Sequence, residues 1–195
     1  MFRGDRYETF EGAVVDVDGW TLHGYEAAIA TGLLGKYDRV ELIDGTLYDR
    51  VAAGPMHAFL SRRVYELALG LAAADYTVGT YFPVALPPNS RPEPDLAIAR
   101  GSATNYSARF PVAEDVLLVV EIGDETIARD RDVKRRLYAR HGIPEYWIVD
   151  VGAEVLCRFT KPGRPCAYGK EETFAKTDTL LHELLGEVAV GELFG

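Results

Sequence analysis

A short apolar run that ends in an acid is the feature that most constrains this chain. The segment Val116–Gly123 places five consecutive Val and Leu residues before Glu121. A run of this length and composition is typical of a strand buried on both faces of a sheet. Glu121 would then lie where a core strand meets solvent, a common position for metal ligands and catalytic acids.

A second acid is expected at a similar place. Asp95 follows the turn Pro92–Pro94 and opens an alternating segment, Leu96–Ala99. Proline lacks an amide hydrogen, so it suits the first position of a strand. If this strand pairs with the one that ends at Glu121, two carboxylates meet, and they repel unless a cation or proton lies between them. The alternative is that each acid is simply solvated at its strand end.

A lysine follows in a segment with helical spacing. Lys134 lies within Ile127–His141, and Gly142 is a suitable C-terminal stop for this helix. Lys134 shares a helical face with Tyr138, so its ammonium can reach beneath the helix towards the sheet. The alternative is one more cation on a solvated face. The neighbours expected to point outward are Arg131, Arg135 and Arg136.

Two further residues have roles that spacing leaves open. The Asp44–Gly45 turn between β-prone runs predicts a hairpin over Val40–Val51, in which Glu41 faces either a cleft or solvent. His57 lies near the start of a helix that follows Gly54, where a lone histidine is more often a cap or surface residue than a ligand. The core stripe predicted for that helix is Met56, Phe59 or Leu60, Val64, Leu67 and Leu71.

The remaining segments complete the predicted elements. A polar loop, Gly101–Phe110, is expected to move over a cleft. Tyr146 and Trp147 form either a base-stacking platform or, more often in such a strand, core. Further strands are predicted over Thr77–Leu86, Tyr146–Asp150 and Glu154–Thr160. Pro162–Pro165 then turns the chain into a polar tail, in which Thr179–Leu185 and Val188–Phe194 pack back on the domain.

The order of these groups resembles a known constellation. An Asp, an acid at the end of the next core strand and a lysine resemble the site of the PD-(D/E)XK nucleases, the restriction-endonuclease-like superfamily. The longer pattern is similar to one branch, the Uma-two (Uma2) family of bacterial endonucleases. Each segment alone is common, but their order and spacing make the combined match specific. The matching segments are Tyr37–Leu47, His57, Pro94–Asp95, Leu118–Glu121, Asp132–Lys134, Tyr138–Ala139 and Gly142–Asp150.

This resemblance implies a metal site. Gly123 stands where most of the superfamily has its lysine, so that role passes to Lys134 on the helix. Asp124 and Glu125 stand where serine is expected in the family, which adds negative charge where nucleic acid would approach. The implied site consists of Asp95, Glu121 and Lys134 as catalytic groups, Asp95, Glu121, Glu41 and the Ile122 carbonyl as ligands of Mg²⁺ or Mn²⁺, and His57 as an accessory residue.

Charge and size bear on the substrate and on the number of domains. The chain has 195 residues, 48% of them apolar, enough for one substantial core. Its formal net charge of −9 opposes tight nucleic-acid binding, which comes largely from Lys and Arg. Basic residues concentrate between Arg129 and Arg140, where a local positive stripe is expected. We predict an N-terminal extension with a lead-in helix over 1–36, the helix at about Leu22–Leu34, and a restriction-endonuclease-like domain over 37–195.

The compartment is predicted from cysteine usage and the N-terminus. Cys157 and Cys166 have no histidine or second cysteine pair at ligand spacing, so neither a zinc site nor a disulfide framework is indicated. Residues 1–8 are polar, unlike a signal peptide, and no apolar run reaches membrane-spanning length. We expect a cytoplasmic protein without a membrane partner.

The sequence thus predicts an α/β domain, with a mixed β-sheet core flanked by helices, that acts as a Mg²⁺-dependent endonuclease on nucleic acid, with DNA as the expected substrate. The Lys134 side chain is expected to point at the gap between Asp95 and Glu121. The alternative is a non-catalytic nuclease-fold module that binds a protein partner. A homodimer is left open.

Overall fold

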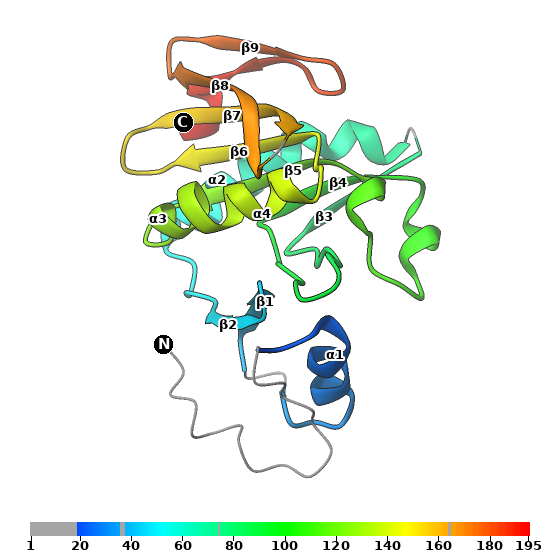
Figure 1. Ribbon diagram of the computed structural model, residues 1–195. Coiled ribbons are helices and arrows are strands. Elements are labelled where there is room, and N and C mark those ends of the chain that lie inside the picture. Colours follow the sequence, from blue (N-terminus) through cyan, green and yellow to red (C-terminus); the bar gives the residue numbers. More distant parts are fainter. Residues whose placement is uncertain (1–18, 36–37, 74, 164) are drawn as a thin grey trace.

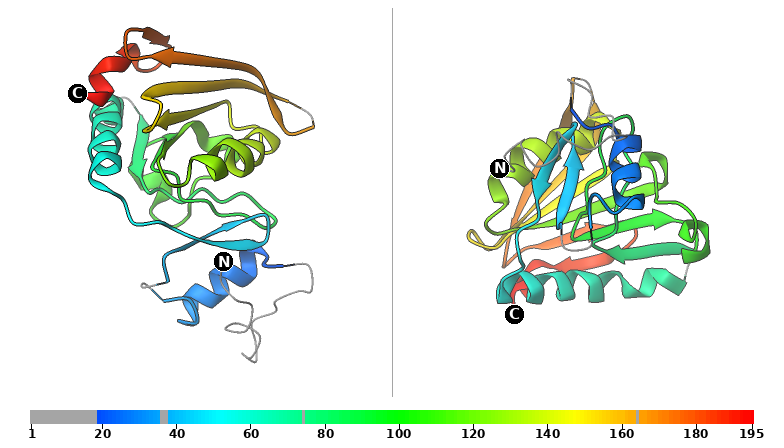
Figure 2. Two further views of the ribbon diagram at one scale, coloured as in Figure 1. Left: turned by 90° about the vertical axis from the view of Figure 1, so that its left-hand side faces the viewer. Right: turned by 90° about the horizontal axis from the view of Figure 1, so that it is seen from below.

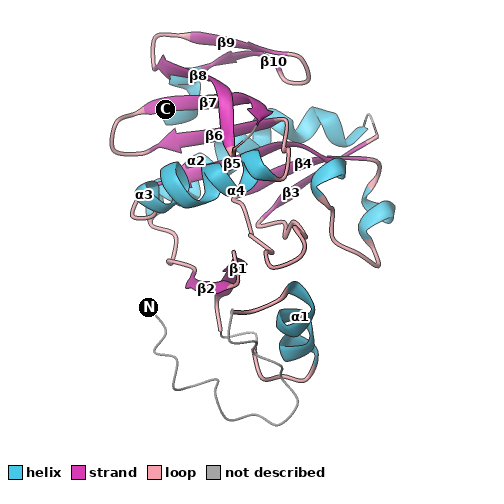
Figure 3. Ribbon diagram, viewed as in Figure 1, coloured by secondary structure: helices cyan, strands magenta, loops and turns pink. Residues whose placement is uncertain are grey.

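The computed structural model describes residues 19–35, 38–73, 75–163 and 165–195, and its centre is a six-stranded mixed sheet (Figures 1 and 3). Neighbouring strands are antiparallel, with one exception: the third and fourth strands in spatial order are parallel. A helical crossover joins these two strands, as parallel neighbours require. In spatial order the strands are β3 (Tyr76–Thr80), β4 (Leu96–Arg100), β5 (Val116–Gly123), β6 (Glu145–Asp150), β7 (Val155–Gly163) and β8 (Ala167–Ala175).

The pairing of β4 with β5 brings the two predicted acids to one edge of the sheet. Leu96 lies opposite Val120 in this antiparallel pair, so the next step of the register sets Asp95 beside Glu121. All of β5 is buried except the half-buried Leu117. The predicted pairing of the two strands is therefore confirmed, as is the buried character of the second.

Hydrophobic cores cover both faces of the sheet. Trp147 belongs to one core and Tyr146 to the other, and neither side chain is exposed, so the base-stacking alternative for them is wrong. The C-terminal segments pack back on the sheet as predicted. One face carries α2 (Pro55–Ala68), the hairpin of β9 (Thr179–His182) and β10 (Gly186–Ala189), and α5 (Val190–Phe194); the opposite face carries α4 (Arg135–Arg140) (Figure 2).

The crossover helix after β5 is not regular. It begins as α3 (Ile127–Arg129), widens into a π-helical turn at Asp130–Lys134 and continues as α4. Gly142 then adopts a φ of 74°, the left-handed conformation that ends the helix as predicted. The expectation of one uninterrupted helix is wrong in its middle, where two charged side chains turn inward. Single π-turns inside α-helices are frequent at functional sites.

A small unit lies beside the sheet and has a hydrophobic core of its own (Figure 1). It comprises α1 (Leu22–Ala30), β1 (Val40–Ile43) and β2 (Thr46–Asp49). Asp44 and Gly45 have φ values of 48° and 75°, as a tight two-residue hairpin requires, so the predicted turn is confirmed. The helix ends earlier than predicted, at Ala30. The core of this unit contains Trp20, Tyr25, Ala28, Leu34, Val40 and Leu42.

Two strand predictions are corrected. β3 starts at Tyr76 and ends at Thr80 rather than Leu86, because Tyr81 takes a φ of 49° and turns the chain out of the sheet. The edge strand β8 was not predicted at all. Its centre, Lys170–Thr173, is polar, and every residue of the strand is exposed or half-buried, so it lacks the apolar alternation that marks a strand.

The helix α2 buries a narrower stripe than predicted. Leu60 and Val64 are buried, whereas Met56 and Phe59 are 47% and 41% exposed. The first turn of this helix therefore projects beyond the core. Of the helices that the structure describes, even α2 with its 14 residues falls short of a membrane span.

Candidate active site

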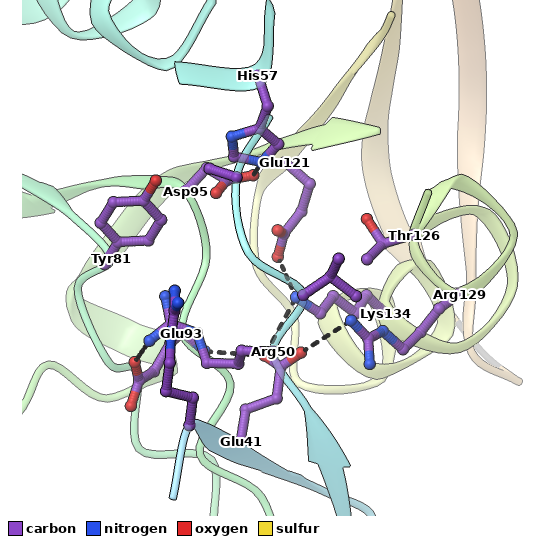
Figure 4. A pocket seen from close by; sticks show the side chains of 13 residues that line it. Glu41, Arg50, His57, Tyr81, Glu93, Asp95, Glu121, Thr126, Arg129 and Lys134 are labelled. Atoms are coloured by element: carbon purple, nitrogen blue, oxygen red, sulfur yellow. Dashed lines mark hydrogen bonds and ion pairs between the residues drawn. The ribbon is translucent and has the colours of Figure 1, made fainter. Parts of the chain in front are cut away.

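A polar cleft lies where the end of β5, the residue before β4 and the hairpin β1–β2 meet (Figure 4). The space in it that water molecules can occupy is about 50 Å³. The loop 101–110, which was expected to move over a cleft, contributes no residue to its lining. The lining residues are Arg39, Glu41, Arg50, Val51, Ala53, His57, Tyr81, Glu93, Asp95, Glu121, Thr126, Arg129 and Lys134. Every side chain predicted for the site is among them.

Asp95 is held by a backbone amide and a histidine. Its Oδ2 accepts a hydrogen bond from the Ile122 N–H at 2.7 Å and lies 3.2 Å from Nε2 of His57. The hydrogen bond to Asp95 raises the pKa of His57 above its usual value, which favours the imidazolium beside this carboxylate. With its side chain 15% exposed, His57 is neither a cap nor a surface residue. The structure thus brings the predicted accessory residue into the site.

Glu121 is buried at the end of β5. Its Oε1 accepts hydrogen bonds from Lys134 Nζ and from the Tyr138 hydroxyl, each at 2.9 Å. Burial raises the pKa of Glu121 well above its usual range, and the Lys134 ammonium acts in the opposite direction. Burial likewise raises the pKa of Tyr138, so this hydroxyl remains a proton donor. One oxygen of the carboxylate is thereby fixed by two donors from the same helix.

Lys134 points into the cleft from the π-turn, but not at the gap that was expected. Its Nζ lies 2.9 Å from Glu121 and 3.1 Å from Glu41, so it bridges these two acids rather than Asp95 and Glu121 (Figure 4). Burial alone would lower the pKa of Lys134, but the carboxylates of Glu121, Glu41 and Asp130 raise it above its usual range. The raised pKa favours the ammonium form of this side chain.

Glu41 faces the cleft, not solvent. It is 1% exposed, and its Oε2 accepts a hydrogen bond from the Glu93 N–H at 3.1 Å as well as the contact with Lys134. Its Oε1 lies 3.7 Å from Arg129. Of the two alternatives that the sequence left open, the cleft-facing one is correct, and the partners that a buried carboxylate needs are present.

The position two residues after Glu121, where most of the superfamily has its lysine, is closely packed in this chain. A Cβ at Gly123 would overlap Cδ1 of Ile127 and lie 3.2 Å from Cγ2 of Ile148. Any side chain at this position would require Ile127 to move and Ile148 to give way slightly. Ile122 contributes its N–H to Asp95, while its carbonyl as a metal ligand remains a prediction. Asp124 and Glu125, the additional acids, are exposed.

Sequence reasoning missed Asp130. This residue is 1% exposed, and its Oδ2 accepts a hydrogen bond from Thr126 Oγ1 at 2.7 Å. Its Oδ1 is buried without a hydrogen-bond partner among the residues that the structure describes. Burial raises the pKa of Asp130, and the nearby Lys134 lowers it. The spacing of four residues before Lys134 on a helix was a usable signal for this position.

Three residues on the hairpin side of the cleft were also missed. Glu93 accepts a 2.5 Å hydrogen bond from Arg50, and burial raises the pKa of this carboxyl. The Arg50 guanidinium also lies over the ring of Tyr81, 5.1 Å from its centroid. Tyr81 is the residue with left-handed backbone at the end of β3. No sequence pattern signals this group, because its members meet only through the tertiary fold.

The basic stripe predicted between Arg129 and Arg140 is largely neutralised. Only Arg129 of this segment lines the cleft, besides Lys134. Each of the outward-pointing cations has an acidic partner, so the stripe is a series of surface ion pairs rather than a free positive surface. These pairs are Arg131 with Asp150 (3.0 Å), Arg135 with Glu171 (3.4 Å), Arg136 with Asp132 (3.9 Å) and Arg140 with Asp44.

The donor set fits a hard divalent ion. Oδ1 of Asp95 and Oε2 of Glu121 accept no hydrogen bond from any described residue, so each acid keeps an oxygen available. No ready-made group of three or more His, Cys, Asp or Glu ligands exists among the described residues. Two carboxylates that each keep one available oxygen suit Mg²⁺, which is commonly bound by one or two carboxylates together with water and substrate phosphate.

Comparison with known proteins agrees with this geometry. A sequence model of the Uma2 family, described as "Putative restriction endonuclease", matches residues 22–190. The chain is similar in structure to "a putative nuclease belonging to DUF820" from Anabaena variabilis ATCC 29413, with a TM-score of 0.68 and 13% sequence identity over 90% of this chain and 97% of that chain. This likeness confirms the predicted fold class. No curated protein matches the chain.

Proposed function

Because the chain belongs to the Uma2 family, as its sequence resemblance indicated, we propose that it is a divalent-metal-dependent endonuclease that hydrolyses phosphodiester bonds of nucleic acid, with DNA as the expected substrate. The observation that carries this proposal is the pair of acids at the ends of β4 and β5. Asp95 and Glu121 each keep a carboxylate oxygen that accepts no hydrogen bond from a described residue, and Glu121 lies 2.9 Å from the buried Lys134 ammonium.

Asp95 and Glu121 would hold Mg²⁺ or Mn²⁺, with Glu41 and the Ile122 carbonyl as further oxygen ligands. When bound, such an ion polarises a phosphoryl oxygen and lowers the pKa of a water molecule. The protein's own contribution is to hold the two carboxylates in fixed positions before substrate arrives. His57 and the Ile122 N–H do this for Asp95, and Tyr138 does it for Glu121.

Lys134 is the electrostatic group of the proposed site. Its ammonium is surrounded by three carboxylates that keep it protonated, so it acts as a cation and not as a general base. In this role it stabilises negative charge that develops on the phosphoryl oxygens or orients the attacking water. The low exposure of its side chain, 4%, strengthens this effect because bulk water does not screen it.

The test is cleavage of DNA with and without Mg²⁺ or Mn²⁺, together with calorimetry of Mn²⁺ binding. Wild-type protein should cleave only with the ion, and chelation should abolish cleavage. Asp95→Ala and Glu121→Ala should lose cleavage and Mn²⁺ binding while remaining folded. Glu187→Ala, which removes an exposed acid from the distant β10, is the matched control and should behave as wild type.

Equal cleavage by wild type and Asp95→Ala at matched purity would show that the activity comes from a contaminant. Absence of cleavage with any divalent ion, together with intact folding, would favour the alternative of a non-catalytic nuclease-fold module that binds a protein partner.

A further inference from the structure

An enzyme with a net charge of −9 needs a local cationic surface to hold nucleic acid. The helical stripe does not supply it, because its arginines are paired with acids. A second groove, with about 410 Å³ of space that water molecules can occupy, lies between α1 and β1 and joins the active-site cleft. The two share Arg39, Arg50 and Glu93. The groove is lined by Tyr25, Ile29, Gly32, Leu34, Gly35, Asp38, Arg39, Val40, Arg50, Arg91 and Glu93.

Arg39 lies where the groove opens into the cleft. It is exposed, and its guanidinium forms no ion pair or hydrogen bond with any residue that the structure describes. Its backbone is fixed, since the carbonyl accepts a hydrogen bond from the Arg50 N–H at 2.8 Å. The free guanidinium thus projects from an anchored chain segment at the junction of the two spaces.

Arg50 lies beside it and is pre-oriented. Glu93 accepts a hydrogen bond from one terminal nitrogen, and the guanidinium carbon lies over the Tyr81 ring, 5.1 Å from its centroid. A guanidinium carries five N–H donors, so one carboxylate contact leaves others available. With its side chain 20% exposed, Arg50 is held in place and still open to the groove.

Arg91 supplies a buried positive charge beneath the groove. It is 7% exposed, and its guanidinium lies 4.5 Å from the centroid of the Tyr25 ring and 4.9 Å from that of Phe110. Its Nε is buried without a partner among the described residues. Arg91 thus adds a buried positive charge to the lining of the groove, and this charge favours an anion there.

We propose that the groove between α1 and β1 binds the phosphodiester next to the scissile one, so that a nucleic-acid strand runs from the cleft past Arg39 and Arg50. Planar guanidinium groups match the oxygens of a phosphodiester. Arg39 is the principal contact, because Glu93 already offsets part of the Arg50 charge. The buried Arg91 adds a positive electrostatic potential to the groove. This inference rests on the proposed function for the identity of the reacting centre.

Salt-dependent binding tests the proposal directly. Labelled single-stranded DNA and RNA oligonucleotides are titrated by fluorescence anisotropy in metal-free buffer between about 50 and 200 mM salt, where one phosphate contact accounts for roughly a threefold change in affinity. In Arg39→Gln, the affinity should fall less steeply with salt than in wild type, by the roughly threefold change that one phosphate contact contributes. Arg39→Lys should keep the wild-type salt dependence. The DNA and RNA arms decide which backbone is held more tightly.

Arg136→Gln is the matched control, because it removes an arginine of equal charge from the helical stripe. It should leave the salt dependence unchanged. In Mg²⁺, Arg39→Gln should also raise the KM for cleavage with kcat nearly unchanged, as expected for a contact that binds ground and transition states equally.

The outcomes separate this inference from the proposed function. If wild type cleaves DNA but Arg39→Gln keeps the wild-type salt dependence and KM, the groove assignment is wrong and the nuclease assignment stands. If Arg136→Gln shows the loss instead, the helical stripe is the phosphate surface. Arg39-dependent binding without cleavage would support the groove and overturn the nuclease. Absence of both binding and cleavage would overturn both.

Discussion

The ammonium nitrogen of Lys134 lies 2.9 Å from Oε1 of Glu121, so a helix supplies to the end of β5 the cation that the strand lacks at Gly123. This contact also makes Lys134 the counter-charge of a buried acidic group that includes Glu41 and Asp130. Buried carboxylates are costly without such a partner. The lysine is therefore expected to serve both stability and turnover.

Replacing Lys134 should separate those two roles. Lys134→Met leaves the buried acids without their cation, so the free energy of unfolding should fall by about 3 kcal/mol in metal-free buffer. Added Mg²⁺ should recover part of this loss, because a bound ion supplies positive charge to the native state only. The cleavage rate should stay lowered by roughly 10²-fold or more.

Thermal unfolding with and without Mg²⁺, and single-turnover cleavage, measure these effects. Arg135→Met, which removes an exposed cation from the same helix, is the control and should change neither quantity greatly. A Lys134→Met protein as stable and as active as the control would remove the lysine from the site.

A side chain at Gly123 should lower stability. Gly123→Ala forces Ile127 or the buried Ile148 to shift, and overpacking of this kind costs about 1–3 kcal/mol. Gly70→Ala is a suitable comparison, because a Cβ at that position meets nothing within 4 Å. Urea unfolding of both variants provides the measurement. Equal midpoints would mean that α3 moves freely.

The Tyr138 hydroxyl should act through Glu121. Tyr138→Phe leaves only Lys134 to fix the carboxylate, so Mn²⁺ affinity measured by calorimetry should fall about tenfold or more. Tyr168→Phe is matched in chemistry, since its hydroxyl bonds to the Ile143 carbonyl in the same aromatic cluster, away from the acids. Equal Mn²⁺ affinity in the two variants would make the Tyr138 contact a structural one.

A second buried ionic group should affect stability alone. Glu145, at the start of β6, accepts hydrogen bonds from Arg158 at 2.7 and 3.0 Å and from Trp147 at 2.5 Å, and lies 3.5 Å from His182. Burial acts to raise the pKa of Glu145, but hydrogen bonds from His182, Arg158 and Trp147 bring it below its usual value of 4.5. This group lies at the opposite end of the sheet from Glu121.

An acid with a lowered folded-state pKa stabilises the fold above its unfolded pKa, and that contribution is lost as the pH falls through the folded value. Glu145→Gln should therefore lower the free energy of unfolding by about 2 kcal/mol at neutral pH. The difference from wild type should shrink below the unfolded pKa of 4.5, with cleavage unaffected. Urea unfolding at neutral and acidic pH tests this, and a difference that does not depend on pH would contradict it.

The sequence was most informative where local pattern and long-range structure coincide. The apolar run before Glu121 and the proline turn before Asp95 each define a strand boundary, and the adjacent strands then have few ways to pair. Lys134 could be placed beneath its helix because its spacing from Tyr138 marks one helical face. These residues meet in the cleft as the pattern indicated.

The contact of Lys134 with Glu41 could not be predicted from local sequence pattern. Its contact with Glu41 depends on how the unit of α1, β1 and β2 lies against the sheet, and no periodicity encodes that arrangement. The cluster of Arg50, Tyr81 and Glu93 forms for the same reason. The edge strand β8 was missed because it is exposed, so pairing with β7 rather than burial defines it.

The π-turn at Asp130–Lys134 also bears on how relatives of this chain can be recognised. Such a turn accommodates one residue more than a regular α-helical turn while the flanking helix stays continuous. A relative with one residue fewer between its glutamate and its lysine would reach the same point through an uninterrupted α-helix. The interval in sequence is therefore not a constant of the site, and a motif written with a fixed number of positions between the two would overlook chains with the same arrangement in space.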